Sequence, residues 1–245
     1  MKILILTIML CSVSLSISAQ KQTAPETKAK IAVADNPVNL AKSAFEAHGG
    51  KKLKELKTLT VRGSVDITTS TITQAIPATF ATVFAGEKYI FELNNPFQPV
   101  KQVFDGTETL SNIRGGFTLP PLTKFGFPLL SKYDENGFKV SALTASDSRK
   151  KGFRIEMSNG EFTDFYLDEK TKQVKGYKSG FQIDGRNITT SVEIDKFRLV
   201  DGVLIPERYA QRFDLGQMTV YADFKAKEII VNSPISDDKF VLENK

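Results

Sequence analysis

Hydrophobic and polar residues follow two different spacings along the chain, and the spacing changes near Leu59. Upstream of that point, apolar residues recur at the spacing of one helix face: Val38, Ala41, Ala44 and Phe45. Asn36 followed by Pro37 is typical of a helix start, and Gly49 with Gly50 is typical of a helix end. We therefore expect one helix that begins at Pro37 and ends before Gly49.

From Leu59 onward, apolar and polar residues alternate, which is the pattern of a strand with one buried face. Strand character recurs in later segments: residues 76–84, 88–94, 100–104, 108–113, 138–143, 153–157, 162–167, 174–183, 187–199, 203–213 and 218–230. Turn sequences such as Asp105-Gly106 and Asn159-Gly160 separate most of them. The pattern predicts a mainly β protein, with strands paired in sequence order as an antiparallel meander. A meander of this length must close, curl or leave an apolar face open.

One segment, residues 115–132, fits neither spacing. It contains three prolines, which remove backbone donors and disfavour a strand, so a loop with a short helix is expected. It is also too apolar for an ordinary surface loop. We expect it to cover the open side of the sheet, either as a lid or as a core plug that never moves. Its large apolar residues are Phe117, Leu119, Leu122, Phe125, Phe127, Leu129 and Leu130.

The first 19 residues have the pattern of a signal peptide: one lysine, a short apolar run and small residues that end at Ala19. The apolar run is shorter than the roughly 20 residues that a membrane-spanning helix needs. Residues 20–36 contain almost no large apolar side chains, which predicts a disordered linker. The expected organisation is a cleaved signal peptide at 1–19, this linker, and a single domain over 37–245.

Motifs of the common enzyme classes are missing from the sequence. It has no P-loop, no dinucleotide-binding glycine motif and no nucleophile elbow, and cleavage would remove Cys11, its only cysteine. His48, the single histidine, is expected to cap the helix or to be solvated. Neighbouring carboxylates, such as Asp164 with Asp168, are expected on solvated surface. We therefore predict a non-enzymatic protein without catalytic residues, metal or cofactor.

Composition adds two expectations about the ligand. The net charge of +5 comes from interspersed Lys, Arg, Asp and Glu residues, so a nucleic acid partner is not indicated. The chain has 18 Phe, 6 Tyr and no Trp. Phe supplies apolar area without a polar group, which suits a cavity for saturated chains as well as an ordinary β core.

Residues 84–93 (FAGEKYIFEL) followed by 103–110 (VFDGTETL) form a strand, a hairpin and a DG-x-T turn. This stretch resembles the strand, hairpin and DG-x-T-x-W turn of the periplasmic lipoprotein carrier and sorting family, the LolA/LolB-like proteins. Residues 194–206, continuing through 229–232 to 238–241, are similar to the closing strands and the D-x-x-F ending of such proteins. With AHGG at 47–50, the similarity covers most of residues 36–242.

The resemblance implies an incomplete antiparallel β-barrel, a curved sheet whose concave apolar face is covered by helices. It also implies a periplasmic carrier that shields the acyl chains of lipoproteins or lipids in transit to the outer membrane, with membrane-bound donor or acceptor proteins as partners. The carriers have a basic residue before a proline where this chain has Ala85 to Lys88, so the cargo stays open between lipoprotein and free lipid. Expected cavity residues are Phe80, Phe84, Tyr89, Phe91 and Leu93, and expected lid residues are Phe117, Leu122, Phe125, Phe127, Leu129 and Leu130.

Two other hypotheses remain beside the carrier. The same scaffold could serve as an envelope protein-interaction or sensor module, with a cavity filled by its own side chains. A hydrolase of unfamiliar type would require two carboxylates that converge in a cleft.

Overall fold

The computed structural model describes residues 36–113, 118–119, 122–183, 185–216 and 218–241. The predicted signal peptide, all of the predicted linker except Asn36, and Phe117 of the predicted lid lie outside the described residues.

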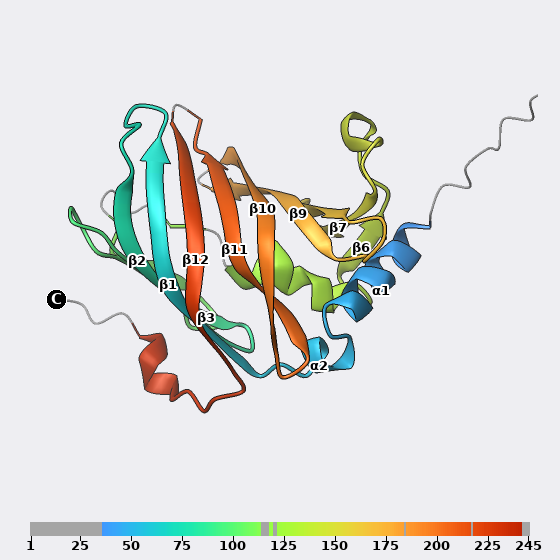
Figure 1. The fold of residues 1–245 in the computed structure, drawn as a ribbon, viewed down its shortest axis with the longest axis horizontal. Helices are drawn as coiled ribbons and strands as arrows, with labels where there is room; N and C mark the ends of the chain where they lie inside the picture. Colours follow the sequence, from blue (N-terminus) through green and yellow to red (C-terminus); the bar gives the residue numbers. More distant parts are fainter. Residues whose placement is uncertain (1–35, 114–117, 120–121, 184, 217, 242–245) are drawn as a thin grey trace, which may run out of the picture. The chain divides into compact units, whose positions relative to one another are not determined.

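A single antiparallel sheet of 12 strands dominates the fold, as predicted for a mainly β chain (Figure 1). Its strands are β1 (Thr58–Thr69), β2 (Ile76–Ala85), β3 (Lys88–Asn94), β4 (Val100–Phe104), β5 (Thr109–Ser111), β6 (Phe138–Ser141), β7 (Gly152–Met157), β8 (Phe162–Leu167), β9 (Val174–Ile183), β10 (Arg186–Val200), β11 (Val203–Asp214) and β12 (Thr219–Val231).

The strand order is β5-β4-β3-β2-β1-β12-β11-β10-β9-β8-β7-β6. Ten of these pairs join strands that are consecutive in the chain, as the meander prediction requires. The eleventh pair joins β1 to β12, with Val65 opposite Phe224, so the expectation of pairing purely in sequence order was wrong at this point. Both strands are long and apolar on one face, and pairing them leaves only the short strands β5 and β6 as edges.

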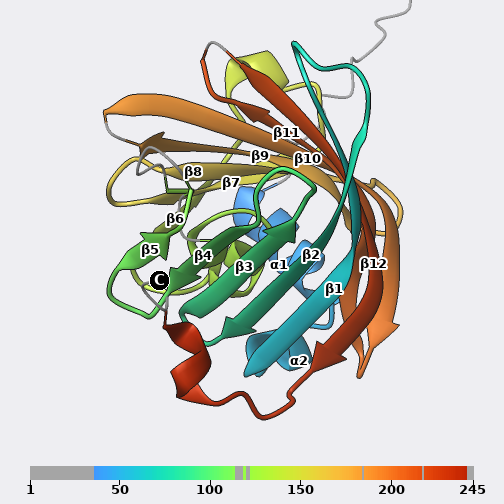
Figure 2. The ribbon, with the colours of Figure 1, turned by 90° about the vertical axis from the view of Figure 1, so that its left-hand side faces the viewer.

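The sheet curls so that one face is concave, and it does not close, because β5 and β6 are not paired (Figure 2). The predicted incomplete barrel is therefore confirmed. Short helices occupy the concave side: α1 (Pro37–Ala47), α2 (Lys51–Lys54), η1 (Leu122–Lys124) and η2 (Phe127–Lys132). Two further 3-10 turns are η3 (Ala145–Asp147) and η4 (Asp237–Phe240), and Phe240 of η4 packs on Ile90 and Val103 on the other face of the sheet.

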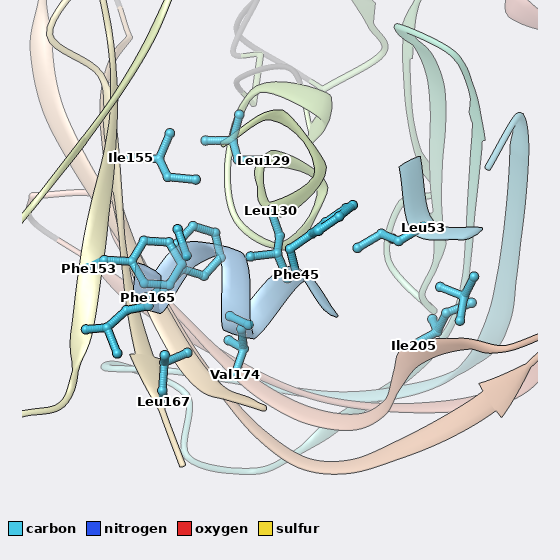
Figure 3. Close-up of a cluster of buried hydrophobic side chains, with 14 residues drawn as sticks. Phe45, Leu53, Leu129, Leu130, Phe153, Ile155, Phe165, Leu167, Val174 and Ile205 are labelled. Atoms are coloured by element: carbon cyan, nitrogen blue, oxygen red, sulfur yellow. The ribbon is translucent and has the colours of Figure 1, made fainter. Parts of the chain in front are cut away.

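Helix α1 has the predicted ends. The Asn36 side chain accepts a hydrogen bond from the Val38 backbone N–H at 2.9 Å, and Pro37 occupies the first turn. The helix buries one apolar face, which joins the main core with η2 and strands β7 and β8. Figure 3 shows this core, in which Phe45 of α1 lies near Leu130 of η2.

His48 is the C-cap residue of α1, as one of the two expectations had it. Its side chain is completely buried, so the alternative expectation of a solvated side chain was wrong. Its Nδ1–H donates to the Leu204 carbonyl at 3.2 Å, and its Nε2 accepts from the Val174 backbone N–H at 2.9 Å. Burial lowers the pKa of His48 to about 4, against the smaller opposing effect of the Leu204 hydrogen bond. The neutral imidazole thus joins the end of α1 to β9 and β11. The close approach depends on Gly49, where a Cβ would lie 2.7 Å from the Gly202 carbonyl oxygen.

Asp164 also differs from the sequence expectation of a solvated surface position, because its carboxylate is only 2% exposed. It lies directly opposite Arg154 in the neighbouring strand, and the guanidinium donates to both carboxylate oxygens at 2.6 and 2.7 Å. The Arg154 guanidinium also covers the Phe162 ring at 3.7 Å. This carboxylate is part of a paired structural contact and not of a catalytic dyad.

The burial of His48 predicts a loss of stability in mild acid. An unfolded histidine has a pKa near 6.5, whereas the folded His48 stays neutral down to about pH 4. Between these values only the unfolded state binds the proton, so the free energy of unfolding should fall by up to about 1.4 kcal/mol per pH unit. The stabilisation is fully present above pH 6.5. Urea denaturation at several pH values from 7.5 to 5 measures it.

The matched control is His48→Gln. Because the chain has no other histidine, this variant should be less stable at pH 7.5 but nearly independent of pH down to about pH 5. An equal pH dependence in both proteins would contradict the assignment.

Candidate binding cavity

A cavity of about 310 Å³ lies on the concave side of the sheet, which places it at the small end of the usual range of ligand pockets, about 300–1,000 Å³. Strands from both halves of the sheet and the lid segment form its wall. The lining residues are Leu59, Val61, Ile67, Thr82, Phe84, Phe91, Leu93, Val100, Ile113, Leu119, Leu122, Phe125, Phe127, Pro128, Tyr177, Val192, Ile205, Pro206, Tyr209, Gln211, Phe213, Leu215, Val220, Ala222 and Phe224.

The described part of the cavity wall is apolar. None of the described residues that line the cavity is charged, and only four have a polar side chain: Thr82, Tyr177, Tyr209 and Gln211. An ionised ligand group would find no counter-ion among these described residues, which makes its desolvation costly. The site therefore suits a long apolar group, and its lining offers no pair of carboxylates for hydrolysis.

The part of the chain that the structure describes contains neither a metal-ligand cluster nor a membrane-spanning helix. Its His, Cys, Asp and Glu side chains form no group of three or more that could hold a metal ion. Its helices include none that is long and apolar enough to cross a membrane.

The five predicted strand residues share the concave face of the sheet, and three of them, Phe84, Phe91 and Leu93, line the cavity. Phe80 and Tyr89 are directly opposite Leu93 and Phe84, and cross-strand partners point to the same side of a sheet. Neither lines the cavity. The Phe80 ring packs edge-on against Phe224 at 5.0 Å, and Tyr89 is fully buried.

The lid segment, described at residues 118–119 and 122–132, divides into two parts. Leu122, Phe125 and Phe127 line the cavity together with Leu119. Leu129 and Leu130 have no exposed surface and lie in the main core, between α1 and the aromatic residues of β7 and β8 (Figure 3). The first part of the lid segment therefore forms part of the cavity wall, and the second part anchors the segment in the main core.

Sequence reasoning missed the opposite wall, which comes from β9 to β12. Val192, Tyr209, Phe213 and Phe224 lie there, far in sequence from the predicted residues. Their period-two alternation is visible in the sequence, but the β1–β12 pairing that brings them to the same cavity is not.

Buried hydrogen bonds hold the lid segment to both halves of the sheet. Gln102 of β4 pairs with the backbone of Leu119: its Nε2 donates to the carbonyl at 2.7 Å, and its Oε1 accepts from the N–H at 2.6 Å. The same Nε2 donates to the Tyr89 hydroxyl. On the other half, the Gly126 N–H donates to the Thr163 hydroxyl of β8 at 3.1 Å.

An ion pair at the surface adds a weaker contact. Lys132 Nζ lies 2.6 Å from a Glu87 carboxylate oxygen, and the Glu87 side chain is 57% exposed. Exposed pairs of this kind contribute little to stability. The buried contacts of Gln102 and Thr163 therefore account for most of the polar attachment.

Gly126 allows the lid segment to lie against Tyr177. Its φ of +65° is in the left-handed region, and a Cβ would lie 2.6 Å from the Tyr177 ring. Any larger residue would have to displace either the ring or the segment.

No protein-family model matches the chain, and no curated protein sequence matches it. Among solved structures, a LolA superfamily protein from Nitrosomonas europaea superposes with a TM-score of 0.52 at 9% identity, over 84% of this chain and 98% of that one. A DUF1329 family protein from Desulfovibrio piger gives 0.48 at 9% identity, over 84% and 98%. A putative outer membrane lipoprotein-sorting protein domain from Vibrio parahaemolyticus gives 0.48 at 6%, over 84% and 97%. The likeness to the Nitrosomonas protein shows that this chain has a LolA-like fold.

Gly126→Ala tests the contact between the lid segment and Tyr177. We expect the variant to lose about 1–3 kcal/mol of unfolding free energy through overpacking, in addition to the backbone strain of a positive φ. Gly160→Ala is the matched control, because Gly160 also has a positive φ (+84°) but a Cβ there would meet nothing within 4 Å. Urea denaturation compares the two variants, and equal losses would show that the Tyr177 contact adds nothing.

Proposed function

We propose that this protein is a non-enzymatic periplasmic carrier that holds the acyl chains of a lipid or lipoprotein in its concave cavity during transit to the outer membrane. The observation that carries the proposal is the cavity itself, which has an uncharged and mainly aliphatic and aromatic wall. The predicted signal peptide supports export, and the LolA-like fold is consistent with a carrier scaffold.

The energetics suit reversible binding. Each buried methylene contributes about 0.8 kcal/mol, so roughly ten of them would contribute on the order of 8 kcal/mol. Loss of translational and rotational freedom offsets part of this gain. The remaining affinity is enough to shield an acyl chain in water and weak enough for release to an acceptor.

The lid segment offers a route for exchange. It is part of the connection between β5 and β6, the two free edges of the sheet, so its displacement would break none of the strand pairing. The polar contacts that would break include those of Gln102, Thr163, Glu87 and Tyr177. A ligand that binds the open state more tightly than the closed state would shift the segment outward.

The alternative is an envelope interaction or sensor module whose cavity is filled by its own side chains. One observation favours it: α1 and η2 already fill the concave side near β7 and β8 with the main core. The hollow between the lid segment and the central strands favours the carrier, because a module of that kind has no need for it.

Leu122→Glu tests the carrier. The substitution introduces a charge into the apolar wall, and we expect it to weaken the binding of a fluorescent fatty acid more than tenfold, or about 1.4 kcal/mol. Leu199→Glu is the control, since Leu199 is 67% exposed and is not part of the cavity lining. Circular dichroism checks that both variants keep the β signature. Unchanged binding by Leu122→Glu would contradict the placement of the ligand.

A further inference from the structure

The polar side chains of the cavity are grouped and not scattered. Tyr177 of β9 is directly opposite Val192 of β10, and Val192 is directly opposite Gln211 of β11. Tyr209 lies two positions before Gln211 on the same face of β11. Three of the four polar lining residues therefore surround one apolar residue on the floor of the cavity.

The Tyr209 hydroxyl has no hydrogen-bond partner among the described residues, although its ring is fixed by stacking on Phe224 at 4.7 Å. No fully buried side-chain nitrogen or oxygen in the described part of the chain lacks a partner. The Tyr209 hydroxyl is therefore not fully buried, and Tyr209 is one of the residues that line the cavity. Burial raises the pKa of Tyr209, and the neighbouring Tyr177 raises it further to a lesser extent. The Tyr209 hydroxyl therefore stays protonated and can donate a hydrogen bond.

The other two residues are held in place by the protein. The Tyr177 hydroxyl is hydrogen-bonded to the backbone of Phe127, in the lid segment. Gln211 Nε2 donates to the Thr190 hydroxyl at 3.0 Å, and that hydroxyl donates to the Arg212 carbonyl at 3.0 Å. The Gln211 carboxamide oxygen has no partner within the described residues and remains an acceptor.

The arginines next to Tyr209 and Gln211 in the sequence do not reach these polar side chains. Arg208 and Arg212 alternate with Tyr209 and Gln211 along β11, so they are on the other face of the sheet. Each forms an ion pair there, Arg208 with Asp195 and Arg212 with Asp214. The floor of the cavity thus offers hydrogen bonds to a ligand without offering a positive charge.

We propose that Tyr177, Tyr209 and Gln211 form a subsite for the uncharged carbonyl of an ester- or amide-linked acyl chain. This inference rests on the carrier function proposed above. A carbonyl oxygen would accept from the tyrosine hydroxyls, and an amide N–H would donate to the Gln211 oxygen. A free fatty acid anion or a phosphate would be buried there without a counter-ion, which is costly. The carrier then selects acyl chains that are covalently linked over free fatty acids.

The test compares ligands of equal chain length by displacement of a fluorescent apolar probe at pH 8: methyl decanoate, N-methyldecanamide, decanoate and 1-chlorodecane. We expect the ester and the amide to bind at least tenfold more tightly than decanoate. In Tyr209→Phe, which keeps the ring stacking, ester and amide binding should weaken about fivefold, the value of one hydrogen bond. Binding of 1-chlorodecane should not change.

Tyr221→Phe is the matched control, because Tyr221 lies on the same strand as Phe224 but is 44% exposed and does not line the cavity. Tyr177→Phe in addition to Tyr209→Phe should weaken the ester further. Decanoate that binds as tightly as the ester, or a Tyr209→Phe variant that binds all four ligands like the wild type, would overturn this subsite alone. Displacement by none of the four would overturn the carrier proposal and the subsite with it.

Discussion

The pairing of β1 with β12 is the constraint on which the rest of the structure depends. It joins the first and last strands at the centre of the sheet, so that the free edges become β5 and β6. It also brings the aromatic residues of β2 and β3 to the same hollow as those of β11 and β12. The lid segment, part of the connection between those edges, then crosses the open side. Without this pairing the cavity would have one wall.

The concave side has two regions with different roles. Near β7 and β8, α1 and η2 fill the curve with aliphatic and aromatic side chains, and His48 joins this core to β9 and β11 through two hydrogen bonds. Near β1 and β2 the curve remains hollow, and the lid segment belongs to both regions. Its Leu129 and Leu130 supply stability, whereas Leu122 and Phe125 face the space where a ligand would bind.

Local features of the sequence predicted most of the elements. The N-cap at Asn36, the alternation from Leu59 and the Gly-containing turns place α1 and all 12 strands close to their observed bounds, because each signal acts over a few residues. The partners of His48 could not be predicted, since Val174 and Leu204 lie 126 and 156 residues away. The same limit applies to Tyr209 and Phe224. The apolar and polar alternation of their strands is visible in the sequence, but their position opposite the predicted cavity residues depends on the long-range pairing of β1 with β12.

The most direct test is native mass spectrometry of the protein, expressed from the full sequence and purified without detergent, followed by organic extraction of the same sample. A carrier should retain one equivalent of an acylated molecule, and the extract should identify it as a lipid or an acylated protein. A tightly folded protein that is empty in both measurements would contradict the account and favour an interaction module on the same scaffold.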